Sequence, residues 1–80
     1  MKIILPKEGT LYKKDYSFKL EYNLEMAYGE KVFKFVLLKL KSWEGIKRTY
    51  EKNEGQIYFM KEEQFINYLY GEGYIDKKQL

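Results

Sequence analysis

The chain has 80 residues, so we expect a single domain over residues 1–80 with a small hydrophobic core. It contains no Cys and no His, which excludes disulfides, thiolate zinc sites and imidazole metal sites and leaves aromatic packing and oligomerisation as supports. The formal net charge is +3 and the isoelectric point is near 9.0, which mildly favours anionic partners and argues against a strongly acidic DNA mimic.

Hydropathy and residue usage bear on where the protein works. The apolar run at Ile3–Leu5 is too short for a signal peptide, and no stretch approaches the roughly 20 apolar residues of a membrane span. We therefore expect a cytoplasmic, soluble protein with no membrane role. Heavy use of Lys, Tyr, Glu and Asn beside a single Arg suggests an AT-rich coding sequence, as in many small phage or mobile-element genes.

The first half of the chain predicts a short strand and then a long hairpin. Ile3–Leu5 is a strand candidate that ends at a proline, and the polar segment 7–15 is expected to be a loop. From residue 16 to residue 28 apolar and polar side chains alternate without a fault, which is the period of a half-buried strand. After a break at Gly29–Glu30, the segment 31–41 predicts a second strand that is apolar on both faces.

The second half predicts two further strands. Ser42–Gly45 is expected to be a turn, with Gly45 available for a positive φ, and Ile46–Lys52 alternates again. Asn53–Gly55 reads as a three-residue hairpin loop that ends in Gly, and Gln56–Met60 reads as the return strand.

The period then changes to that of a helix. Glu62 and Glu63 suit the positive end of a helix dipole, and Gly71 suits a helix stop. Beyond it, residues 73–75 are expected to fold back onto the body, and residues 76–80 to form a frayed tail. The sequence thus predicts an α+β fold: a four-stranded antiparallel meander, with a short N-terminal strand in addition, and one C-terminal helix.

No catalytic signature is present. Without His, no Ser, Thr or Lys nucleophile has an imidazole to activate it. Glu62–Glu63 is better explained as helix-start charge in water than as a catalytic pair, and Gly71–Gly73 follows a helix instead of opening one, unlike a phosphate-binding loop. We expect no enzyme, no catalytic residue, no metal site and no cofactor.

The two-faced strand at 31–41 requires cover on both sides. The predicted helix supplies one apolar face, formed by Phe65, Ile66 and Leu69. The other face is covered either by the N-terminal segment and the C-terminal tail or by a second copy in a homodimer. The odd-numbered residues provide the candidate dimer or partner face, which consists of Phe33, Phe35 and Leu37.

A basic segment with interleaved aromatics runs from residue 39 to residue 52. If the strand continues straight, Lys39, Lys41 and Trp43 form one row, and across the turn three further residues share one face of the next strand. Such a sheet suits single-stranded nucleic acid, because cations pair with phosphates and rings stack on unpaired bases. The alternative is an ordinary solvated strand face with Trp43 closing the core edge. The candidate nucleic-acid-binding residues are Lys39, Lys41, Trp43, Lys47, Arg48, Tyr50 and Lys52.

Two segments resemble the positive-cofactor-four (PC4-like) family of single-stranded DNA-binding proteins. Residues 36–43 resemble that family's apolar-then-basic second strand, and residues 55–65 are similar to its last strand running into a Glu-Gln-aromatic helix start. The resemblance implies a dimer formed through helices and sheet, with single-stranded nucleic acid along curved strand ridges. The chain departs from the pattern at Asn53–Glu54, where the family has a basic pair, and it lacks the usual Pro at the helix start.

Two functions remain open on the sequence. The first is a dimeric module that binds single-stranded DNA or RNA through the basic segment. The second is a phage- or mobile-element-type (anti-CRISPR-like) inhibitor that binds a host or defence protein, favoured by the small size and the Tyr-rich composition, since Tyr and Trp suit protein interfaces.

Overall fold

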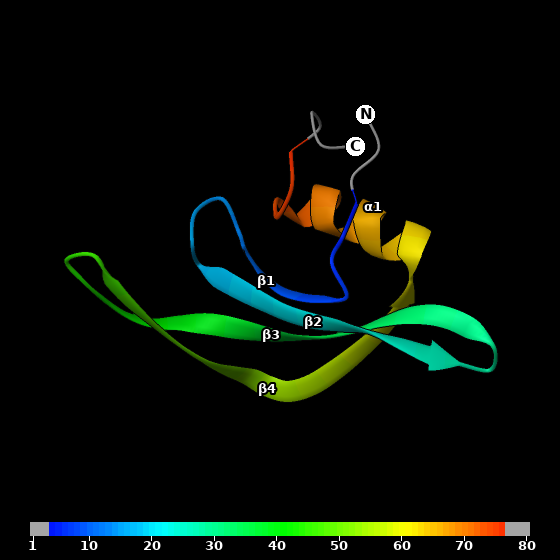
Figure 1. Cartoon of the computed structure of the whole chain (residues 1–80). Helices are drawn as coiled ribbons and strands as arrows, with labels where there is room; N and C mark the ends of the chain where they lie inside the picture. The colour runs from blue at the N-terminus through cyan, green and yellow to red at the C-terminus, as the bar shows by residue number, and fades with distance from the viewer. Residues whose placement is uncertain (1–3, 77–80) are drawn as a thin grey trace.

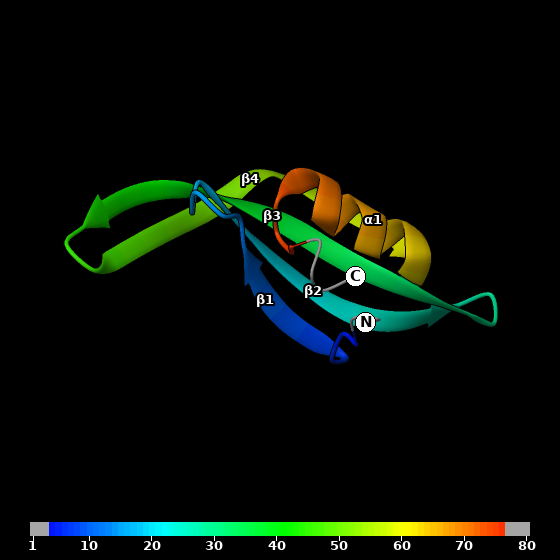
Figure 2. The same ribbon diagram turned by 90° about the horizontal axis from the view of Figure 1, so that it is seen from above.

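The structure, a computed structural model, describes residues 4–76, with the side chains of residues 53–55 excepted. It contains, in chain order, β1 (Glu8–Tyr12), β2 (Phe18–Ala27), β3 (Glu30–Glu44), β4 (Lys47–Lys61) and α1 (Glu62–Glu72). The strands form one antiparallel sheet in the order β1-β2-β3-β4, and α1 lies over β3 and β4 on one face (Figure 1; Figure 2). The predicted α+β class, a four-stranded antiparallel meander with one C-terminal helix, is confirmed.

The first strand lies later in the chain than predicted. Ile4 and Leu5 are not in a strand, Ile3 lies outside the described residues, and β1 occupies part of the expected loop. Its residue Gly9 stands opposite Tyr22 in β2, and a Cβ added to Gly9 would lie 3.1 Å from the Tyr22 hydroxyl. The missing side chain therefore lets the Tyr22 ring pack across β1, which a polarity pattern alone does not reveal.

The predicted hairpin loop at residues 53–55 is wrong, because β4 runs as one strand through it. The ladder with β3 pairs Val36 with Ile57 and Leu38 with Lys52, so the extra residues of β4 form a bulge opposite a single residue of β3. The two predicted strands 46–52 and 56–60 are thus halves of one element. The sheet has the four strands predicted for the meander only because one strand was split and β1 was missed, and the additional N-terminal strand is not formed at Ile4 and Leu5.

The two hairpin turns are short and are set by residues with positive φ. Tyr28 and Gly29 connect β2 to β3 with φ of 53° and 78°, the pair of left-handed residues that a type I′ turn requires. β3 continues to Glu44, beyond the start of the turn predicted at 42–45, and Gly45–Ile46 connect it to β4 with Gly45 at φ 61°. At this turn β3 is therefore three residues longer than predicted, and β4 begins at Lys47, one residue later than predicted.

The core lies between the sheet and α1. Phe65 of the helix packs on Phe33 and Phe35 of β3, with ring centroids 4.9 Å and 5.0 Å apart. The residues after the helix fold back as predicted, since Tyr74 and Ile75 are buried in the same cluster. The remaining buried members of the core are Leu20, Tyr22 and Leu69.

The predicted dimer or partner face on β3 is wrong. Phe33 and Phe35 are 2% and 1% exposed beneath the helix, and Leu37 packs against the same core. The helix therefore covers the odd-numbered face, and the even-numbered apolar residues of β3 lie on the other side of the sheet, which we call the open face. Leu5 also joins the core on the helix side, as do Tyr74 and Ile75, so neither described terminal segment covers the open face.

The last predicted feature, a frayed tail at residues 76–80, lies largely outside the described residues. Asp76 is described, and its carboxylate forms an ion pair with Lys14, 2.6 Å away. The helix ends at Glu72, one residue after the predicted stop, because Gly73 takes φ 85° and its N–H bonds back to the last turn.

Candidate nucleic-acid interface

Strands β3 and β4 extend beyond the rest of the sheet as a two-stranded hairpin. The first ladder residue of β2, Phe18, faces Lys39, and the Leu40 N–H donates to the Ser17 carbonyl, after which β3 has β4 as its only partner among the described strands. We call residues 40–50 the arm (Figure 1). The helix lies over the opposite end of these strands and does not reach the arm (Figure 2).

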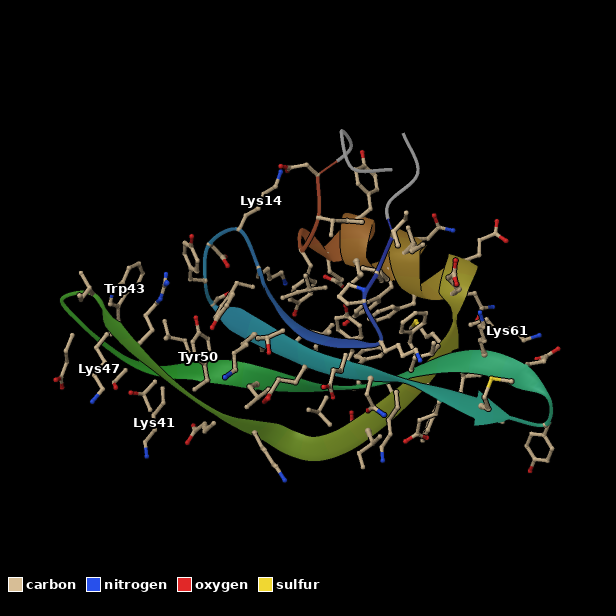
Figure 3. All side chains as sticks on the ribbon, viewed as in Figure 1. Lys14, Lys41, Trp43, Lys47, Tyr50 and Lys61 are labelled. Atoms are coloured by element: carbon tan, nitrogen blue, oxygen red, sulfur yellow. The ribbon has the colours of Figure 1, made fainter. Side chains whose placement is uncertain are left out.

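A β-bulge in the arm separates the residues that were predicted to form one row. The ladder pairs Leu40 with Tyr50 but Ser42 with Thr49, so Lys41 is the extra residue of β3. Beyond the bulge, the odd-numbered residues of β3 lie on the face that carries the even-numbered residues before it. Trp43 therefore lies opposite Arg48 and not in line with Lys39. Figure 3 shows Trp43 on one side of the arm and Lys41 and Lys47 on the other. The predicted row Lys39–Lys41–Trp43 is therefore wrong.

The predicted common face of Arg48, Tyr50 and Lys52 is confirmed. These three residues alternate along an unbroken stretch of β4 and pair with Trp43, Leu40 and Leu38 of β3. Leu38 and Leu40 belong to the open face, so the same face continues from the sheet onto the arm.

Three aromatic rings gather around Arg48 on this face. The Arg48 guanidinium lies 3.8 Å from the centroid of Tyr16, 5.4 Å from Trp43 and 5.8 Å from Tyr12. Tyr50 joins the group through Tyr12, with ring centroids 5.8 Å apart. We call Tyr12, Tyr16, Trp43, Tyr50 and Arg48 the aromatic cluster. Each cation–π contact contributes about 0.5–1 kcal/mol at an exposed site, so Arg48 links the arm to the β1–β2 loop.

Tyr12 and Tyr16 were not predicted as site residues. Both lie in or next to the segment that was expected to be a loop, and their position follows from β1, which was not predicted. A usable signal was present, because Gly9 and Leu11 alternate with Thr10 and Tyr12 as in a strand.

The β1–β2 loop fixes the orientation of Tyr16. Asp15 accepts hydrogen bonds from the Ser17 N–H at 3.0 Å and the Ser17 hydroxyl at 2.6 Å, and these bonds hold the pKa of the Asp15 carboxyl below its ordinary value. Tyr16 itself has φ 61°, a left-handed conformation that costs a bulky residue about 1–2 kcal/mol. The Tyr50 hydroxyl donates to the Tyr16 carbonyl at 2.9 Å, which ties this strained residue to the arm.

The clustered rings remain accessible. Trp43 is 54% exposed, Tyr12 is 43% exposed and Tyr16 is 39% exposed. The Trp43 indole N–H donates to the Gly45 carbonyl at 2.8 Å, so the ring is fixed while its outer face is open to solvent. Rings that are held in place and exposed can stack on a planar ligand at a small entropic cost.

The charge of the chain is concentrated in and beside the arm. Residues 39–52 hold five positive and two negative side chains, an excess equal to the whole chain's net charge of +3. The four ion pairs among described residues all lie elsewhere, and none of the five cations of this segment is ion-paired with a described residue. Arg48 and Lys52 share the aromatic side, and Lys39, Lys41 and Lys47 lie on the opposite side with Glu51 and Glu44.

Within residues 4–76, no three His, Cys, Asp or Glu side chains are grouped so that they could hold a metal ion. No helix in that range is long and apolar enough to cross a membrane. The comparisons of this chain with protein-family models, curated proteins and solved structures found no match.

Proposed function

We propose that this chain is a non-enzymatic module that binds single-stranded nucleic acid through the arm and the aromatic cluster. The observation that carries the proposal is that two features occur on the two sides of one short segment: fixed, exposed rings and cations without a described ion partner. Rings alone suit many ligands, and cations alone suit any anion. Together they match a ligand that carries planar bases on a chain of phosphates.

The two sides of the arm have different roles in this proposal. Unpaired bases stack on Trp43, Tyr16 and Tyr12, and each stacked base contributes about 1–3 kcal/mol. Lys52 and Lys19 flank the rings on the open face, while the lysines on the opposite side of the arm add long-range attraction for phosphates. Arg48 is engaged by three rings, so it acts mainly as a positioning residue for the stacking surface.

Duplex DNA should bind this site more weakly than a single strand. Its bases are stacked on one another and do not reach protein rings, so it can use only the phosphate contacts. We therefore expect the protein to prefer single strands over duplexes of the same length, with an affinity that falls as salt rises.

The test is a titration of labelled single-stranded and duplex oligonucleotides at low and moderate salt, followed by fluorescence anisotropy. Trp43 is the only tryptophan, so quenching of the intrinsic fluorescence reports contact at the arm itself. Because Lys41 and Lys47 lie nearer to the bound strand, Lys41→Glu/Lys47→Glu should weaken binding more than Lys7→Glu/Lys31→Glu, which makes the same charge change at exposed sites outside the arm. Absence of binding at low salt, or equal losses in the two variants, contradicts the proposal.

A protein target is the second candidate, as in the inhibitor hypothesis. It is favoured by the arm tip, where Ile46 is fully exposed at 100% beside the half-exposed Trp43. Apolar side chains at a protruding tip suit insertion into a protein groove. The variant Ile46→Lys discriminates between the candidates, because it should abolish a complex with a protein target and leave oligonucleotide binding intact.

A further inference from the structure

The open face of the sheet consists of cross-strand rows, because the ladders set one residue of each strand side by side. The first row, next to the arm, consists of Tyr12, Lys19, Leu38 and Lys52. The second row consists of Thr10, Glu21, Val36 and Ile57. The charge on the open face therefore changes from two cations to one carboxylate within two residues of each strand, a distance of about 7 Å.

Beyond the first row, the cations of the open face are neutralised and two carboxylates are not. The two lysines that the ladders place there, Lys34 and Lys61, are each ion-paired with a glutamate, at 3.8 Å and 3.2 Å. Glu21 and Glu8 are exposed, and neither is ion-paired with a described residue. Both of these carboxylates also line a shallow hollow in the open face. This part of the sheet should therefore repel a phosphate chain.

The rings of the aromatic cluster have a spacing that suits an unstacked strand. The ring centroids of Trp43 and Tyr16 are 6.3 Å apart, and those of Tyr16 and Tyr12 are 6.1 Å apart. The rings are tilted by 68° and 55° to one another, so each ring offers its own face to one base. The spacing is nearly twice the rise of about 3.4 Å per nucleotide in a stacked strand, which allows one nucleotide for each ring.

We propose that the site holds a short stretch of about three to four nucleotides, and that Glu21 and Glu8 prevent the strand from continuing across the sheet. This inference rests on the proposed function and adds the length of the ligand to it. One base lies on each of the three rings, and the phosphates lie near the cations of the first row. A further nucleotide would bring its phosphate to the second row, which is well within the screening length of about 10 Å at 0.1 M salt. It would meet repulsion there and gain no contact.

The opposite face of the arm offers no longer path. The lysines on that face end at Lys39, and the next residue of β3 on the same face is Leu37. Leu37 lines a hollow together with Glu72 from the last turn of α1. The helix therefore closes this route, and both faces confine the strand to the arm and the first row.

Oligothymidylates of two to twelve nucleotides test the length of the site, with quenching of Trp43 fluorescence as the readout. We expect the affinity to rise steeply up to about four nucleotides, and then only in proportion to the number of positions at which a longer strand can bind. The slope of log K against log salt should be nearly the same for six and twelve nucleotides, about −2 for three contacted phosphates. A steep rise that continues to eight nucleotides, or a steeper slope for the longer strand, overturns the inference and leaves the proposed function standing. Absence of binding at every length overturns both.

The variant Glu21→Lys tests the boundary. It should let the strand reach the second row, so the ratio of the affinity for eight nucleotides to that for four should rise about two- to fivefold. The matched control Glu63→Lys makes the same charge change at an exposed residue of the helix and should leave this ratio unchanged. Because both residues are exposed, both variants should keep the circular dichroism spectrum of the parent. An unchanged ratio in Glu21→Lys, or equal increases in the two variants, overturns the role of Glu21.

Discussion

The body of the sheet and the arm are built from the same two strands, β3 and β4, but their surroundings differ. In the body, Phe35 of β3 is 1% exposed beneath α1 and touches rings from β4 and the helix. In the arm, Trp43 of the same strand is 54% exposed, and its ring contacts among the described residues are with Tyr16 and Arg48. One strand therefore contributes to the core at one end and to the exposed aromatic cluster at the other.

This contrast teaches where the stability of so small a domain resides. The core aromatics are buried and contact several neighbours, and burial of apolar surface contributes roughly 25 cal/mol per Å². The arm is held by a few cation–π and hydrogen-bond contacts of about 1 kcal/mol each. We therefore expect changes in the body to alter unfolding and changes in the arm to alter binding.

The largest effect should come from the centre of the body. Phe65 is fully buried and packs on Phe33, Phe35 and Tyr22, so Phe65→Ala should lower the free energy of unfolding by about 3–5 kcal/mol. This is a large part of the total for an 80-residue domain, so Phe65→Leu serves as the milder variant that keeps the fold. Urea unfolding measures both. A loss at Phe65 no greater than that of Trp43→Ala would remove the distinction between body and arm.

A second large effect is expected at alkaline pH. Burial raises the pKa of Tyr22, Tyr68 and Tyr74, the last most strongly. The unfolded chain then releases its phenolic protons first, so the stability from these residues is complete below about pH 10 and falls as the pH rises further. Urea unfolding across the alkaline range should show this loss, and Tyr74→Phe should reduce it. The exposed Tyr28→Phe is the control, and an equal effect there would contradict the assignment.

The close contact between β1 and β2 gives a prediction of intermediate size. Gly9→Ala places a Cβ 3.1–3.3 Å from three atoms of the Tyr22 ring and should lower the free energy of unfolding by about 1–3 kcal/mol. Gly71→Ala, in the helix with no neighbouring atom within 4 Å, should raise it by about 0.5–1 kcal/mol. Thermal unfolding of the pair measures the difference, and effects of the same sign would show that the Tyr22 contact is not tight.

The class of the fold was predictable because its signals are periodic. The alternation from residue 16 to 28 locates β2, and the spacing of Phe65 and Leu69 locates the buried face of α1. The residue types at Asn53–Gly55 predicted a hairpin turn, and this prediction was wrong. The same residues can form a bulge when the facing strand is long enough to pair with the chain on both sides of the bulge. The length of β3 is a tertiary property, and no local pattern specifies it.

The candidate site was predictable only in part, for a related reason. The face of Arg48, Tyr50 and Lys52 followed from the period of two, and it is correct. The bulge at Lys41 has no signature in an otherwise regular strand, so the facing of Trp43 was misassigned. Tyr16 reaches the site through a left-handed φ in a loop, a conformation that sequence periodicity does not encode.

A smaller effect is expected from the bond that joins the arm to the β1–β2 loop. Tyr50→Phe removes the hydrogen bond to the Tyr16 carbonyl and should lower the free energy of unfolding by about 0.5–1.5 kcal/mol. It should also shift the fluorescence of Trp43, because the Tyr16 ring against which the indole packs is released. The control Tyr28→Phe removes a hydroxyl from a fully exposed tyrosine and should change neither quantity. A stable Tyr50→Phe with unchanged fluorescence would mean that the loop holds Tyr16 without the arm.

The smallest expected change in stability belongs to Trp43→Ala, and it separates the two regions most directly. The ring is more than half exposed, so its loss should alter the free energy of unfolding by no more than about 0.5–1 kcal/mol. Among the described elements, no third strand pairs with the arm and no helix lies over it, so its amides should exchange by local opening while those of the body require global unfolding. Trp43→Ala should therefore speed amide exchange at residues 40–50 and leave exchange at Phe33 and Phe35 almost unchanged. Uniform acceleration across both regions would mean that arm and body unfold as one unit. The two ends of β3 would then differ in solvent exposure but not in local stability.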